Sequence, residues 1–166
     1  MNREAVIARV RSLVASDQSE DAILQETVCL LQETQPGWNW VGIYLLVGDT
    51  LVLGPYVGKP TEHVRIAVGS GVCGTAVAEN TNIVVDDVRT RENYLACSLE
   101  TRSEIVVLIR DDAGIVGQFD IDSDRVATFG ARDEALLTSL ATLVAPHCRT
   151  LIQHGVSTTP IGASVS

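Results

Sequence analysis

Positions 97 to 123 read CSLETRSEIVVLIRDDAGIVGQFDIDS, and the rest of the chain can be arranged around this stretch. It predicts two apolar strands, Glu104–Asp111 and Ile115–Asp122. A short loop that ends in Gly114 joins them, which is typical of a hairpin whose last loop residue is left-handed. Such a loop pairs Asp111 with Ile115 and, further along the ladder, Glu104 with Asp122.

Alternation along the two strands separates an apolar face from a mixed one. The apolar face is predicted to carry Ile105, Val107, Ile109, Ile115, Gly117, Phe119 and Ile121. The mixed face sets Glu104 opposite Asp122, with Asp120 as a diagonal neighbour, beside Val106, Leu108 and Val116. Like charges that face each other across a sheet are destabilising, so this cluster needs a reason. A solvated edge is the commoner arrangement, but the apolar neighbours favour a pocket in which at least one carboxyl keeps its proton.

Length and composition indicate a globular chain with an acidic surface. The 166 residues carry a formal charge of −9 and 46% hydrophobic residues, which predicts one domain over residues 1–154 and a disordered tail at 155–166. Such a charge disfavours nucleic acid and anionic membranes as partners. We expect no membrane-spanning run and no signal peptide, so the predicted location is the cytoplasm.

The four cysteines are predicted to be thiols rather than a disulfide framework, because no secretory signal opens the chain. No C-x-x-C spacing occurs, so a structural zinc site is not predicted. Cys73 falls near the start of a predicted helix of small residues, where the helix dipole favours a thiolate. A tight helix–sheet contact would explain the same residue. Cys29 lies beside the apolar stripe of its helix and is interpreted as a small buried core thiol, whereas Cys148 is interpreted as structural or incidental.

The remaining pattern predicts an α+β fold with a central antiparallel sheet of about six strands. Further strands are expected at 38–47, 50–57, 63–67 and 83–85, and helices at 2–16, 20–35, 72–79 and 131–153. The terminal helices should cover one face, whereas the short helix and a long loop at 89–102 should cover a pocket on the other. Trp40, Gly42 and Tyr44 share a strand face, which is either core or an aromatic wall with a gap at the glycine.

Several motifs resemble the free methionine-(R)-sulfoxide reductases, which are GAF-domain enzymes that reduce the free amino acid. They are WNWVGIYL at 38–45, LGPYVGKP at 53–60, VRI at 64–66, GSGVCGTA at 69–76, AC at 96–97, SEIVV at 103–107 and FDIDS at 119–123. The resemblance covers most of residues 36–146. It implies that Cys97 attacks the substrate and that Glu104, Asp120 and Asp122 hold its sulfoxide end. Trp40 and Tyr44 would enclose the methyl group.

One position departs from the pattern of that family. Many members carry a third cysteine where this chain has His63, so Cys73 or an external thiol would have to resolve the oxidised Cys97. His63 is then either a group that stabilises the Cys97 thiolate or an ordinary histidine at a strand end.

The resemblance also implies partners and a mechanism. The implied mechanism needs no metal or organic cofactor, and it uses a thioredoxin-type or small-thiol reductant. Members of the family often form homodimers through their terminal helices, so a homodimer is expected. Two alternatives stay open from sequence, namely a non-catalytic GAF sensor of a small ligand and a thiol redox sensor in which Cys73 and Cys97 form a reversible disulfide.

Overall fold

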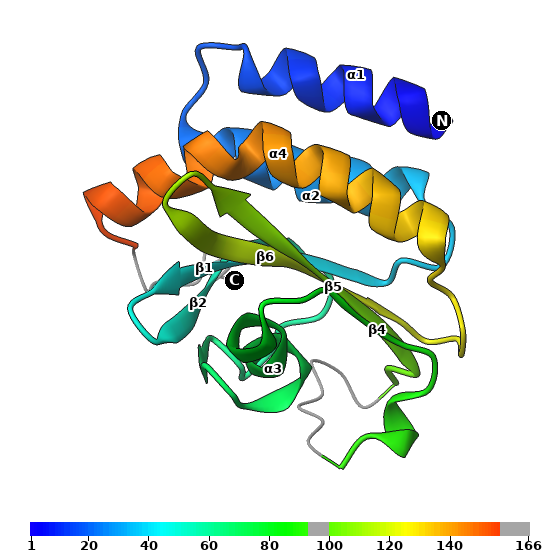
Figure 1. The fold of residues 1–166 in the computed structure, drawn as a ribbon. Helices are drawn as coiled ribbons and strands as arrows, with labels where there is room; N and C mark the ends of the chain where they lie inside the picture. Colours follow the sequence, from blue (N-terminus) through cyan, green and yellow to red (C-terminus); the bar gives the residue numbers. More distant parts are fainter. Residues whose placement is uncertain (93–99, 157–166) are drawn as a thin grey trace, which may run out of the picture.

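A computed structural model of the chain describes residues 1–92 and 100–156. A six-stranded sheet lies between a layer of three helices and a single short helix (Figure 1). The helices are α1 (Arg3–Val14), α2 (Glu20–Thr34), α3 (Gly71–Glu79) and α4 (Ala131–His154). The strands are β1 (Trp40–Val47), β2 (Thr50–Val57), β3 (Arg65–Ala67), β4 (Ile83–Val85), β5 (Ser103–Asp111) and β6 (Gly114–Ser123). A short 3₁₀ turn, η1, covers Val88–Thr90.

All strand pairs are antiparallel, and the order across the sheet is β3-β2-β1-β6-β5-β4. The prediction of an α+β fold with terminal helices on one face and the short helix on the other is therefore confirmed. Two strands begin two residues later than expected: β1 starts at Trp40 and β3 starts at Arg65.

Local capping explains where the N-terminal helices begin. The Asn2 side chain accepts a hydrogen bond from the backbone N–H of Ala5 at 2.8 Å, and Ser19 accepts one from Ala22 at 3.3 Å. Each bond satisfies a backbone donor that the first turn of a helix leaves without an intrahelical partner.

The register of the β5–β6 hairpin follows the prediction over most of its length and departs from it near the turn. Glu104 pairs with Asp122 and Ile109 pairs with Gly117 as expected. Beyond this point the register shifts, so that Asp111 pairs with Gly114 instead of Ile115. The predicted loop, 112–114, is therefore one residue too long. The shift also exchanges the sheet faces on which the side chains of Ile115 and Val116 lie. Val116 packs in the core under the helices, whereas Ile115 packs on the opposite face.

Two apolar cores result from this layering. The larger lies between the sheet and the helical layer, with Val28 of α2, Phe119 of β6 and Leu137 of α4 among its members. The smaller lies between the sheet and α3, and it includes Trp40, Tyr44 and Cys73. The smaller core is thus on the face to which the sequence assigned the carboxyl cluster.

Helix α4 is long and apolar enough to cross a membrane by length and composition alone, contrary to our expectation that no stretch would be. It packs on β5 and β6 and against α1 and α2, and seven of its residues are buried there. This is the position of a core helix of the domain. The helix continues through Pro146 to His154.

Candidate active site

Two strand pairings bring the predicted site residues onto one face of the sheet. Between β5 and β6, Glu104 faces Asp122. Between β1 and β6, Trp40 faces Asp122 and Gly42 faces Asp120. Because side chains alternate along each strand, the aromatic residues of β1 and the acids of β5 and β6 all lie on the α3 side. The structure therefore joins two motifs that are more than sixty positions apart in the sequence.

The three carboxyl groups are buried, which rules out a solvated edge. Glu104 and Asp122 are each 2% exposed, and Asp120 is fully buried. Cys73, the third residue of α3, lies over them with its Sγ 3.9 Å from Glu104 Oε1. The sulfur and one carboxylate oxygen each of Glu104 and Asp120 all lie within 4.8 Å of one another.

Burial raises the pKa of Glu104 well above its usual value. The charges of Asp120 and Asp122 raise this pKa further, as does side-chain hydrogen bonding with Asp120, whereas the contact with Cys73 opposes the shift. The sequence predicted that one of the three carboxyls holds a proton without saying which. The environment of Glu104 suits that role, because its charged form is desolvated and has two acidic neighbours.

Trp40 and Tyr44 form an aromatic wall beside the acids, with their ring centroids 6.4 Å apart. The outer side of Trp40 stacks on Tyr56 at 5.5 Å. Gly42 makes room for this arrangement, because a Cβ atom there would come within 2.4 Å of the Trp40 ring. The gap that the sequence suggested at Gly42 is thus filled by the indole, and the wall is also part of the smaller core.

His63 contributes through its backbone. Its carbonyl oxygen accepts a hydrogen bond of 2.7 Å from the Tyr44 hydroxyl, which fixes the end of that side chain. The imidazole itself is half-buried. Its proposed influence on Cys97 cannot be placed, because Cys97 lies in the segment 93–99, outside the described residues.

The other two cysteines lie away from the acids. Cys148 is fully buried in the core under the helices, and burial raises the pKa of its thiol to about 12. Cys29 on α2 is only half-buried, in contrast to the buried thiol that its position on the helix predicts, and it contacts Gln25 Nε2 at 3.5 Å. Neither contributes to the cluster around Glu104.

Gln118 is a residue of this face that the sequence reasoning missed. It lies two positions before Asp120 on β6, opposite Tyr44 of β1 and Leu108 of β5, and it is fully buried. The signal was present in the sequence, since strand alternation places positions 118, 120 and 122 on the same face.

Cys73, Glu104 and Asp120 also have the donor atoms that a divalent metal ion could use. One thiolate and two carboxylates would suit zinc with an open coordination position. The same negative cluster can instead be neutralised by a proton on Glu104, as its raised pKa favours. That the chemistry needs no metal remains a prediction.

The sequence and the fold of this chain are both similar to those of known proteins. Residues 17–147 match the GAF domain family. The free methionine-R-sulfoxide reductase of Escherichia coli K12 is 44% identical over 129 residues, which are 78% of each chain. The free methionine-R-sulfoxide reductase of Neisseria meningitidis, solved in complex with its substrate, is 36% identical with a TM-score of 0.83 and 92% of both chains covered. The type II enzyme of Thermoplasma acidophilum is 40% identical with a TM-score of 0.77, and the match covers 79% of this chain and 93% of that one.

Proposed function

Because the chain belongs to the GAF-domain family, and within it to the free methionine-R-sulfoxide reductases, we propose that it reduces free L-methionine-(R)-sulfoxide to L-methionine. The observation that carries this proposal is the buried cluster of Glu104, Asp120 and Asp122 under Cys73 and beside the Trp40 ring. A sulfoxide oxygen only accepts hydrogen bonds, so it needs a protonated acid. Desolvation and neighbouring charge provide one in Glu104.

In the proposed reaction the Cys97 thiolate attacks the sulfoxide sulfur and forms a bond to it, while a protonated carboxyl donates one proton to the oxygen. The oxygen then moves to the Cys97 sulfur as the original S–O bond and the new S–S bond break. Methionine leaves, and Cys97 is left as a sulfenic acid. The aromatic rings of Trp40 and Tyr44 would pack against the methyl group of the substrate.

A second thiol then condenses with the sulfenic acid, which forms a disulfide and releases water. We assign this role to Cys73, because it is the described cysteine that contacts the carboxyl cluster. A thioredoxin-type reductant supplies two electrons and two protons to return the disulfide to thiols. We place the reaction in the cytoplasm, where such reductants maintain thiols.

The first test is substitution of the proposed nucleophile. Incubation with free L-methionine-(R)-sulfoxide and dithiothreitol, followed by chromatographic detection of methionine, should show turnover for the wild type and none for Cys97→Ser. Cys29→Ser on the opposite side of the sheet is the matched control and should keep wild-type activity. Asp120→Asn should lower kcat/KM by about 100-fold or more, as expected for loss of a group that supports acid catalysis. Near-normal activity of Cys97→Ser would refute the proposal.

The role of Cys73 needs a separate measurement. If it resolves Cys97, Cys73→Ser should still release one methionine per chain in a single turnover but should turn over poorly with thioredoxin. Mass spectrometry of the wild type after the sulfoxide alone should then show a Cys73–Cys97 disulfide. Unchanged thioredoxin-dependent turnover in Cys73→Ser would instead assign resolution to an external thiol. A protein that forms this disulfide without producing methionine would be a redox sensor.

A further inference from the structure

The amide of Gln118 is buried without a visible reason. The side chain is fully buried, and neither its Oε1 nor its Nε2 has a hydrogen-bond partner among the described residues. Leaving a buried amide group without partners is destabilising, because the group loses its hydrogen bonds to water and gains none in return. A buried polar group of this kind normally meets a ligand or a water molecule.

The neighbours of Gln118 place it next to the proposed chemistry. It is on the same face of β6 as Asp120, and Cα atoms two residues apart on a strand are separated by about 7 Å. Across the sheet it is opposite Tyr44, whose ring belongs to the aromatic wall, and opposite the apolar Leu108. Gln118 is therefore a neighbour both of the acid cluster, along its own strand, and of Tyr44, across the β1–β6 pair.

Two other donors on this face already have acceptors within the protein. The indole N–H of Trp40 donates to the carbonyl oxygen of Lys59 at 3.0 Å. The hydroxyl of Tyr44 donates to the carbonyl oxygen of His63. The Nε2 of Gln118, by contrast, has no acceptor among the described residues, so its N–H groups remain available.

The depth of Gln118 indicates which end of a bound substrate it meets. Desolvating the ammonium and carboxylate of a free amino acid costs more than desolvating its uncharged sulfoxide. The charged end should therefore stay near water, and the sulfoxide should enter the dry floor of the site. A sulfoxide oxygen accepts more than one hydrogen bond, so the acid cluster can supply one and an amide N–H another.

We infer that Gln118 binds the substrate by donating a hydrogen bond from Nε2 to the sulfoxide oxygen, and that it thereby distinguishes the sulfoxide from methionine. This inference rests on the proposed function. The amide is uncharged between pH 4 and 10, so this contact does not depend on which acid is protonated.

The test compares two ligands that differ by this oxygen. In a Cys97→Ser background, which should bind the sulfoxide without reducing it, calorimetric titration gives Kd for L-methionine-(R)-sulfoxide and for L-methionine. Gln118→Leu should weaken sulfoxide binding by about tenfold, as for one lost hydrogen bond in a dry site. Its affinity for methionine should change by less than about twofold. Gln118→Met, which keeps the length of the side chain, should behave in the same way and provides a second variant if the first folds poorly.

The control is Leu108→Met, which alters the residue opposite Gln118 without changing hydrogen bonding, and it should leave both affinities near the wild-type values. Equal weakening for methionine and sulfoxide in Gln118→Leu would overturn the inference, and so would unchanged affinity for both. Failure of the proposed function has a different signature: the otherwise unsubstituted protein would neither bind nor reduce the sulfoxide, and the inference would fall with it.

Discussion

Glu104 shows how one carboxyl can be functional and destabilising together. It lies between Val85 of β4 and Asp122 of β6 and is nearly inaccessible to solvent. Its raised pKa means that the folded protein holds this proton more tightly than the unfolded chain does. The same desolvation that prepares an acid for a sulfoxide oxygen therefore makes the folded state sensitive to high pH.

This sensitivity gives a prediction for Glu104→Gln. In the wild type, stability should fall as pH rises from the ordinary value of 4.5 to the raised pKa, because the unfolded chain releases this proton in that range whereas the folded state keeps it. Glutamine does not titrate, so the variant should lose less stability over the same range, by about 1.4 kcal/mol for each unit of the pKa shift. Melting temperatures from pH 4 to pH 8 measure the difference. The exposed Glu26→Gln serves as control, and parallel curves for wild type and Glu104→Gln would contradict the prediction.

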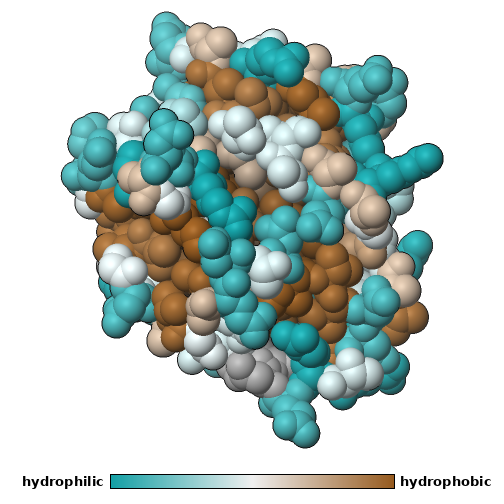
Figure 2. Space-filling view, viewed as in Figure 1, coloured by the Kyte–Doolittle hydropathy of each residue, from teal (hydrophilic) through white to brown (hydrophobic). Residues whose placement is uncertain are grey.

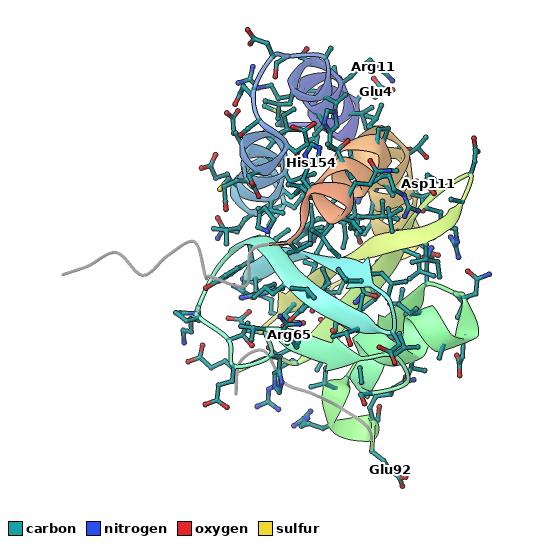
Figure 3. The ribbon with its side chains drawn as sticks, turned by 90° about the vertical axis from the view of Figure 1, so that its left-hand side faces the viewer. Glu4, Arg11, Arg65, Glu92, Asp111 and His154 are labelled. Atoms are coloured by element: carbon teal, nitrogen blue, oxygen red, sulfur yellow. The ribbon has the colours of Figure 1, made fainter. Side chains whose placement is uncertain are left out.

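The β5–β6 hairpin is attached to the helical layer at its turn as well as through its core face. Arg149 of α4 donates to both oxygens of Asp111, at 2.7 and 2.9 Å. Figure 3 shows Asp111 at the tip of the hairpin beside α4. These bonds lower the pKa of Asp111 to about 2. The contact fixes the hairpin end that lies farthest from the acids.

Removing this contact should lower the stability of the folded state only at pH values at which Asp111 is charged. A lowered pKa contributes stability above the ordinary value of 3.8, and this contribution is lost as pH falls toward about 2. Arg149→Met should therefore melt below the wild type at pH 6, and the gap should close as pH falls from 4 toward 2. Arg132→Met, an exposed arginine of the same helix, is the control. A gap of constant size across this range would show that Arg149 acts through packing alone.

In the whole molecule, many apolar side chains of the helical layer are buried against the rest of the chain. Val6 and Val10 of α1 are fully buried against the rest of the chain, and Val144 of α4 is as well. The apolar sides of the terminal helices are thus largely buried within one chain. Figure 2 still shows apolar atoms between hydrophilic side chains over this layer.

The homodimer remains a prediction with a direct test. Light scattering after size-exclusion chromatography should give about twice the chain mass of 17.8 kDa at micromolar concentration. A dilution series is the internal control, because a true dimer should dissociate only at low concentration. A mass of one chain at every concentration would contradict this prediction.

The helices and strands, the hairpin register around Glu104 and Asp122, and the gathering of three acids on one face could all be predicted from the sequence. These features depend on side-chain period and turn chemistry within about twenty residues, which a single sequence displays. The register shift near Gly114 escaped prediction, because a bulge depends on how both strands fit the neighbouring layers.

The surroundings of the acids, by contrast, depend on how distant segments pack together. The tertiary structure paired β1 with β6, which set Trp40 against Asp122, and it brought Cys73 within 3.9 Å of Glu104. It also enclosed Gln118 without a described partner. Pairing between distant segments and the exclusion of water are properties of the packed chain, since neither the neighbours of a carboxyl nor its desolvation is encoded in the residues beside it.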